Sequence, residues 1–188
     1  MLDAMIFGGI VALVAILLSP ILVRYSIDPW VIFAIATIVL LPGFYGALTG
    51  GPFVPTPSKR RDSMLKLAKI KAGETVYDLG CGDGRLVFAA GALGARATGF
   101  ELSIPLVLWG KIQALFGKKG RVCHGDLWRQ DYSKADVIFC YLLPRTMKKF
   151  EHKIWPTLKK GARVVSNGFS MPGIWEKKIE EHVYLYVK

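Results

Sequence analysis

The sequence predicts an α/β domain built on a mainly parallel sheet and preceded by a transmembrane helical hairpin. Two observations lead to this fold class. Residues 1–58 of the 188-residue chain contain three charged side chains, whereas residues 59–188 carry a net charge of +12. Beyond residue 70, short apolar runs alternate with helical patterns, which is typical of parallel strands covered by helices. These features exclude a uniform soluble domain and an intrinsically disordered chain.

The N-terminal part contains two apolar runs long enough to cross a bilayer. Residues 4–23 and 29–49 lack charged side chains, and a membrane-spanning helix needs about 20 such residues. Residues 24–28 connect the runs and are few enough to force an antiparallel hairpin. A cleaved signal peptide is disfavoured because no basic segment precedes the first run. A single span followed by an apolar helix at the membrane interface is the alternative.

Basic residues predict the orientation of this hairpin. Lys59, Arg60 and Arg61 follow the second run, and such charges stay on the cytoplasmic side of a membrane. We therefore expect an integral membrane protein with its C-terminal domain on the cytoplasmic face. Further basic clusters, such as Lys118 with Lys119, would be attracted to anionic lipid. Charge alone would also permit RNA binding, but the membrane tether argues against a nucleic-acid partner.

The chain divides into three parts: the hairpin at 1–49, a Pro/Gly-rich connector at 50–62 and an α/β domain at 63–188. Strands of that domain are expected at Thr75–Leu79, Ala95–Leu102, Arg121–His124, Asp136–Leu142, Arg163–Asn167 and Val183–Val187. Helices are expected at Ser63–Ile70, Arg85–Leu93, Pro105–Phe116 and Pro144–Leu158.

The loop after the first expected strand is the most informative segment. It reads Asp78-Leu79-Gly80-Cys81-Gly82-Asp83-Gly84-Arg85, so a strand runs through three alternating glycines into a helix. Glycines allow a tight turn and close approach of backbone N–H groups to a ligand. The spacing differs from the dinucleotide fingerprint G-x-G-x-x-G, which makes a nicotinamide-dependent dehydrogenase the weaker interpretation.

Acidic residues end the next two strands. Glu101 lies 23 residues after Asp78, where a carboxylate can accept hydrogen bonds from both hydroxyls of a ribose. Asp126 follows the third strand, where an acid or a backbone group can bind an adenine edge. The carboxyl ends of parallel strands meet at one edge of a sheet, so these residues predict a ligand crevice there. The alternative is that the acids are surface residues and the glycines form only a turn.

The segment DLGCGDGR resembles the first motif of the class I S-adenosylmethionine-dependent methyltransferases. This resemblance implies a Rossmann-like sheet and S-adenosyl-L-methionine as the cofactor. It also implies that Asp78 and the loop residues Gly80, Cys81, Gly82, Asp83 and Gly84 hold the methionine end. Glu101 and Leu102 would then bind the ribose, and Asp126 with Leu127 the adenine. About 20 residues follow the fifth strand, so the final hairpin of that fold is expected in abbreviated form, near Ile174–Glu180 and His182–Val187.

A narrower resemblance rests on the connector and two further motifs. PFVPTP at 52–57, GFEL at 99–102 and GDLW at 125–128 resemble the protein-lysine methyltransferases that modify the c-ring protein of ATP synthase and the adenine nucleotide translocase. This implies a protein-lysine acceptor in a membrane protein. Two apolar runs and the lack of a transit sequence favour a prokaryotic relative, hence a prokaryotic cell membrane.

Tyr141, at the end of the fourth strand, and Thr56, in the connector, are the candidates for orienting the acceptor amine. No Asn/Asp-Pro-Pro-Tyr motif follows the fourth strand, which disfavours adenine or glutamine as the acceptor. The cysteine spacing matches no zinc site, so we expect no metal. Methylation of a lipid or another membrane-dissolved molecule is the first alternative function. The second is a non-catalytic, donor-binding assembly factor in the membrane.

Overall fold

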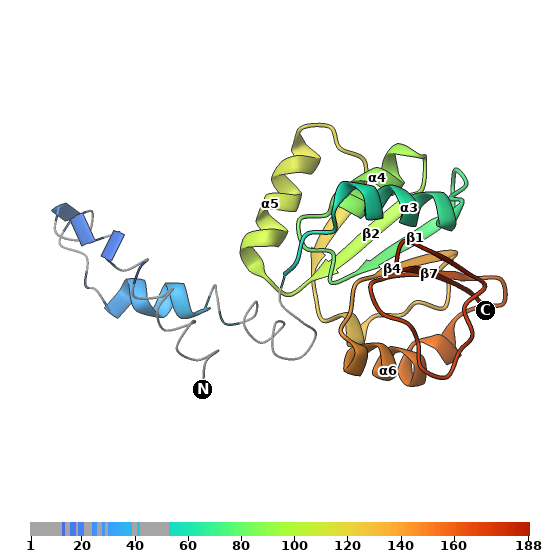
Figure 1. The fold of residues 1–188 in the computed structure, drawn as a ribbon. Coiled ribbons are helices and arrows are strands. Elements are labelled where there is room, and N and C mark those ends of the chain that lie inside the picture. The colour runs from blue at the N-terminus through green and yellow to red at the C-terminus, as the bar shows by residue number, and fades with distance from the viewer. Residues whose placement is uncertain are drawn as a thin grey trace.

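The computed structural model describes residues 53–188 without a gap, together with residues 13, 16–17, 19–20, 24–25, 28, 30–38 and 41. The described residues form a seven-stranded sheet with the order β3-β2-β1-β4-β5-β7-β6 (Figure 1). The strands are β1 Thr75–Leu79, β2 Arg96–Glu101, β3 Arg121–His124, β4 Val137–Cys140, β5 Arg163–Asn167, β6 Lys178–Glu180 and β7 Val183–Val187. The first five are mutually parallel, and β7 lies antiparallel between β5 and β6. The predicted α/β class with a Rossmann-like sheet is confirmed.

Helices cover both faces of this sheet. One core cluster joins the sheet to α3 (Ser58–Ala68), α4 (Arg85–Ala92) and α5 (Ile104–Leu115). The other core cluster contains α6 (Pro144–Lys153) and the short 3-10 helix η2 (Trp155–Thr157). Figure 1 shows α3 and α4 on one side of the strands and α6 on the other. All four residues of β4 are buried between these layers, as a short continuous apolar run predicts.

Two helices differ from the expected bounds. The first was expected at 63–70 but begins at Ser58, directly after Pro57. It buries Met64 and Leu67, and its first turn contains the basic residues at 59–61, so the local pattern resembled a charged connector. The long helix expected at 144–158 ends at Lys153, because Pro156 cannot donate the backbone hydrogen bond that a continuing helix needs.

The C-terminal hairpin is short, as expected from the length of chain that remains after β5. Its strand β6 has three residues and begins at Lys178, later than the predicted 174. Glu181 and His182 join β6 to β7 and both adopt left-handed φ angles, of 51° and 62°. Two such residues form the tight turn that matches the twist of a hairpin.

Most of residues 4–23 and 29–49, the expected hairpin, lie outside the described residues, as do Gly50 to Pro52 of the connector. Residues 30–38 are helical, and the Asp28 carboxylate accepts a hydrogen bond from the Trp30 backbone N–H at 2.9 Å at the start of this helix. In the part of the chain that is described, no helix has both the length and the apolarity needed to span a membrane.

Candidate active site

The loop between β1 and α4 forms an open backbone cradle. Gly82 and Gly84 adopt left-handed φ angles of 55° and 79°, which residues with a Cβ rarely adopt. The backbone N–H groups of Gly80 and Cys81 donate to the carbonyl oxygen of Phe100 at 3.0 and 3.1 Å and fix the loop to β2. A Cβ added to Gly80 would meet no described atom within 4 Å. A ligand can therefore approach the loop backbone at this point.

Glu101, the last residue of β2, braces this cradle. Its Oε2 accepts a hydrogen bond from the Gly82 backbone N–H at 2.9 Å, and its Oε1 accepts one from the Ser103 N–H at 2.8 Å. A carboxylate has about four lone-pair positions, so both oxygens keep capacity for ligand hydroxyl groups. Glu101 thus lies at the predicted strand end, and its second role as a brace for the loop could not be predicted from the sequence.

Asp78 is a buried carboxyl group beside the loop, with 5% of its surface exposed. Burial, followed by the negative charges of Glu101 and Asp83, raises the pKa of Asp78 to about 8. This carboxyl group is therefore mainly protonated at pH 7. A positively charged ligand would favour its ionised form, so the environment of Asp78 suits a cationic group.

Asp126 lies at the neighbouring strand end. The Gly125 backbone N–H donates to the carbonyl oxygen of Glu101 at 3.0 Å, which connects the ends of β2 and β3. The Asp126 Oδ1 accepts a hydrogen bond from the Trp128 N–H at 2.9 Å and caps the 3-10 helix η1 (Leu127–Arg129). Leu127 is buried, and its carbonyl oxygen accepts a hydrogen bond from the Tyr132 hydroxyl at 2.8 Å. The predicted residues at the first three strand ends are therefore brought together at one sheet edge.

Other predicted loop residues have structural partners. The Cys81 side chain packs against Gly99, because a Cβ added to Gly99 would lie 2.5 Å from it. Only the Cys81 backbone therefore faces the cradle. Burial raises the pKa of the Cys81 thiol well above its usual value. A Cβ on Gly84 would approach Val122 at 2.7 Å, which shows how closely α4 approaches β3. Leu102 is half-buried directly after Glu101.

The connector is attached to the glycine loop. The Arg85 Nη2 pairs with the Asp83 Oδ2 at 2.7 Å, and the Arg85 Nη1 donates to the carbonyl oxygen of Thr56 at 2.8 Å. Although burial opposes it, hydrogen bonding from Arg85 holds the pKa of Asp83 below its usual value. The Phe53 ring covers the loop, because a Cβ on Gly82 would lie 2.2 Å from it. Arg85 and Phe53 each lie in a motif that carries the family resemblance, but neither was predicted individually as a site residue.

Tyr141 and Asn167 lie at the ends of β4 and β5. Tyr141 is half-buried and its ring stacks on Phe169 with centroids 6.4 Å apart. Asn167 is fully buried, and its Oδ1 accepts a hydrogen bond from the Arg60 Nη1 at 3.5 Å. Its Nδ2 has no hydrogen-bond partner among the described residues. Since buried polar groups are nearly always paired, this unpaired amide is a candidate for contact with a ligand, although its Nδ2 is itself buried.

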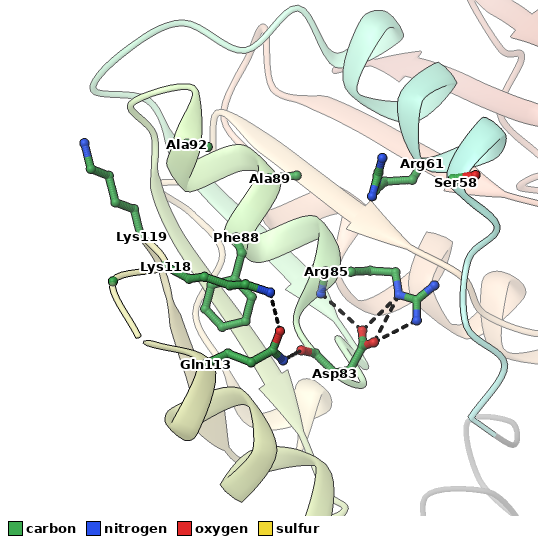
Figure 2. A pocket seen from close by; sticks show the side chains of 11 residues that line it. Ser58, Arg61, Asp83, Arg85, Phe88, Ala89, Ala92, Gln113, Lys118 and Lys119 are labelled. Atoms are coloured by element: carbon green, nitrogen blue, oxygen red, sulfur yellow. Dashed lines mark hydrogen bonds and ion pairs between the residues drawn. The ribbon is translucent and has the colours of Figure 1, made fainter. Parts of the chain in front are cut away.

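A separate cleft of about 700 Å³ lies behind the glycine loop, between α3, α4 and the end of α5 (Figure 2). Asp83 of the glycine loop and Arg85, directly after the loop, line this cleft. Asp78, Glu101 and Asp126 do not line it. It is therefore distinct from the crevice at the strand ends. Within the described residues, no group of three or more His, Cys, Asp or Glu side chains is arranged to hold a metal ion.

Residues 78–178, from the buried aspartate to the start of β6, match the family model of the ANTKMT methyltransferase domain. The chain belongs to this family. The match contains the glycine loop and all three strand ends described above. It confirms the resemblance to class I methyltransferases and to their lysine-modifying members.

Individual relatives agree with this membership. A protein-lysine N-methyltransferase from Saccharolobus islandicus (strain REY15A) is 34% identical over 72% of this chain and 92% of its own length. The adenine nucleotide translocase lysine N-methyltransferase of Mus musculus is 33% identical over 75% of this chain, but the match covers 64% of the mouse protein.

A solved structure of an RNA methyltransferase from Salinibacter ruber, in complex with S-adenosyl-L-homocysteine, has a TM-score of 0.67 and 34% sequence identity to this chain. The match covers 71% of this chain and 93% of that protein. S-adenosyl-L-homocysteine is the product that S-adenosyl-L-methionine leaves after methyl transfer. The expected cofactor is therefore confirmed, and the chain is an S-adenosylmethionine-dependent methyltransferase.

Proposed function

We propose that this protein is a membrane-anchored protein-lysine N-methyltransferase that acts on a membrane protein. The observation that carries the proposal is the joining of Asp78, the glycine loop and Glu101 at one sheet edge in a chain of this family. Lysine as the acceptor is supported by the names of the archaeal and mouse relatives.

The residues present fit the methyl donor. Asp78, buried and poised to ionise beside a cation, lies next to the open cradle at Gly80 and would hold the charged methionine end. Glu101 keeps lone pairs for the ribose hydroxyl groups, and Asp126 with Leu127 would hold the adenine. When bound, the sulfonium supplies an electrophilic methyl group. The contribution of the chain is to position the donor and acceptor and to exclude water.

The acceptor amine must arrive neutral, because an ammonium group has no lone pair with which to attack the methyl carbon. The unperturbed pKa of lysine, about 10.4, leaves few neutral amines at pH 7. Tyr141 and Thr56 are proposed to orient the amine through its N–H groups and to favour the neutral form. Asn167 is proposed to join them, since its unpaired Nδ2 could donate to a carbonyl oxygen of the acceptor segment.

The proposed anchor is the helical hairpin of residues 4–23 and 29–49 in a prokaryotic cell membrane, with the methyltransferase domain on its cytoplasmic face. Its support is the lack of charged side chains in both runs and the basic residues Lys59–Arg61 that follow them. The connector after the hairpin continues into Phe53 and Thr56, which contact the donor loop.

A transfer assay tests the proposal. The full chain is incubated with methyl-labelled S-adenosyl-L-methionine and membranes from a host that lacks the enzyme. We expect label in a protein band that yields methyl-lysine on hydrolysis, and we expect the enzyme to resist extraction from membranes by alkaline carbonate. Label in extracted lipid or in added RNA would replace lysine as the acceptor. Donor binding without any transfer would favour the non-catalytic role.

A further inference from the structure

Helix α5 presents an apolar face that no described residue covers. The helix lies along the edge strand β3, and it lies so close that a Cβ on Gly110 would approach Val122 at 2.7 Å. Its opposite side exposes Leu108, Trp109, Ile112, Leu115 and Phe116, which we call the α5 face. The exposed fractions are 53%, 54%, 42%, 85% and 84% in that order.

The spacing of these residues makes one stripe rather than scattered exposure. Positions 108, 109, 112, 115 and 116 recur at intervals of three and four, which places them on one side of a helix. Single exposed apolar residues are common, but a continuous stripe with two side chains more than 80% exposed indicates an interaction site.

The charged side chains of α5 and of the segment that follows it are all basic. Residues 102–125 contain no Asp or Glu, and they carry Lys111, Lys118, Lys119 and Arg121. Helix α5 is apolar on both its buried and its exposed side. An exposed apolar stripe that is flanked by lysines and contains a tryptophan suits the interface of an anionic membrane. An acidic protein partner would satisfy the lysines but not the five apolar side chains beside them.

The cleft behind the glycine loop extends this basic surface. Lys118 and Lys119 line it on one side and Arg61 on another, as Figure 2 shows. The negative charge of Asp83 in the cleft is neutralised by its ion pair with Arg85. The lysine side chains therefore leave the cleft positively charged, next to the C-terminal end of the α5 face.

We propose that the α5 face docks onto an anionic lipid bilayer, with Leu115 and Phe116 among the acyl chains and Lys118 and Lys119 at the lipid phosphates. The inference rests on the proposed function in taking the membrane as the place where the protein acts. Because α5 begins at Ile104, three residues after Glu101, this docking holds the carboxyl edge of the sheet beside the membrane surface.

Spin labelling of the full chain tests this. A nitroxide is placed at Leu115→Cys, on a Cys123→Ser background, in vesicles of phosphatidylcholine and phosphatidylglycerol. The matched control is Lys148→Cys on α6, an exposed position on the other side of the sheet. We expect the label at 115 to be relaxed at least threefold more by oxygen than by a water-soluble nickel chelate, and the reverse at 148. A label at 115 that is open to nickel, or shielded from both reagents by protein, would overturn the proposal.

A second readout does not depend on cysteine variants. Lipids brominated in their acyl chains should quench the tryptophan fluorescence of the full chain, and Trp109→Phe should remove at least a quarter of that quenching. Unchanged quenching would also overturn the proposal. Lysine methylation is measured on the same samples. Methylation with a water-exposed α5 face rejects only the docking, whereas a lipid-facing α5 without lysine methylation rejects only the acceptor.

Discussion

The Glu101 carboxylate and the Gly82 backbone N–H are joined by a 2.9 Å hydrogen bond across the end of the sheet. Glu101 is expected to bind the ribose of the donor. The same side chain supports the glycine loop, which is expected to hold the methionine end. The expected donor binding and the loop geometry therefore depend on one side chain.

Replacing Glu101 should weaken both functions. We expect Glu101→Ala to lower donor affinity at least tenfold and the free energy of unfolding by about 1–3 kcal/mol, since two backbone donors lose a charged acceptor. Calorimetric titration with S-adenosyl-L-methionine and urea unfolding measure the two effects. The matched control is Glu74→Gln at the opposite edge of the sheet, which removes an ion pair with Arg163 and should change stability alone. Unchanged donor affinity in Glu101→Ala would refute the assignment of the ribose site.

The contact between Phe53 and Gly82 predicts a specific double-variant result. Gly82→Ala introduces a Cβ 2.2 Å from the Phe53 ring at a φ of 55°, so we expect strain and steric displacement together. Gly161→Ala has a φ of 85° and no described atom within 4 Å of the added Cβ. It therefore measures backbone strain alone, which should lower the free energy of unfolding by about 1–2 kcal/mol.

We expect Gly82→Ala to lose more stability than Gly161→Ala and to lose at least tenfold in donor affinity. Adding Phe53→Ala to Gly82→Ala should recover the part of the stability loss that comes from the clash. Thermal unfolding of these three variants and of the unaltered protein measures this. If the double variant were no more stable than Gly82→Ala, the ring would not be held against the loop.

Asp78 predicts how donor affinity depends on pH. Its pKa is about 8 in the folded chain, so below pH 8 binding of a cationic donor must displace a proton. Affinity should therefore rise with pH between 6 and 8, by up to about tenfold per unit, and level off above 8. Asp78→Asn should remove this dependence and bind the donor more weakly at pH 8. A profile of equal slope in both proteins would contradict the prediction.

The same group has the opposite effect on stability without the donor. The unfolded chain releases the Asp78 proton near pH 4, whereas the folded chain keeps it until about pH 8. The folded state thus binds more protons in this window, and its stability falls as the pH rises from 4 to 8. Asp78→Asn should be the more stable protein at pH 8, by a factor of ten or more in its folding equilibrium. Urea unfolding of both proteins at pH 4 and at pH 8 checks this.

Asn167 allows the acceptor site to be probed with a nearly isosteric change. Asn167→Asp keeps the oxygen that accepts from Arg60 but removes the unpaired Nδ2. We expect a tenfold or larger fall in kcat/KM for a lysine-containing substrate, with less than a threefold change in donor affinity. Asn167→Ala, which also loses the Arg60 contact, should be less stable than Asn167→Asp. An unaltered kcat/KM in Asn167→Asp would remove Asn167 from the acceptor site.

The sequence predicted the strands and the first three strand ends because their signals are local. An apolar run followed by Asp78 and alternating glycines, or by Glu101, marks both a strand and its carboxyl end within ten residues. The contacts that complete the site are not local. Arg85 reaches Thr56 across 29 positions and Arg60 reaches Asn167 across 107. Such pairs depend on how α3 and the connector fold back over the sheet, and no pattern along the chain indicates them.

The Arg85–Thr56 hydrogen bond limits how far the enzyme can reach. It fixes the connector at Thr56 to the first residue of α4, and the proposed second span ends at Thr49, seven residues before Thr56. Seven residues extend over at most about 25 Å. With the proposed span as its anchor, the transferable methyl group would be confined to a layer near the lipid. We expect lysines in short loops at the bilayer surface to lie within that layer, and lysines on tall extramembrane domains to be out of range.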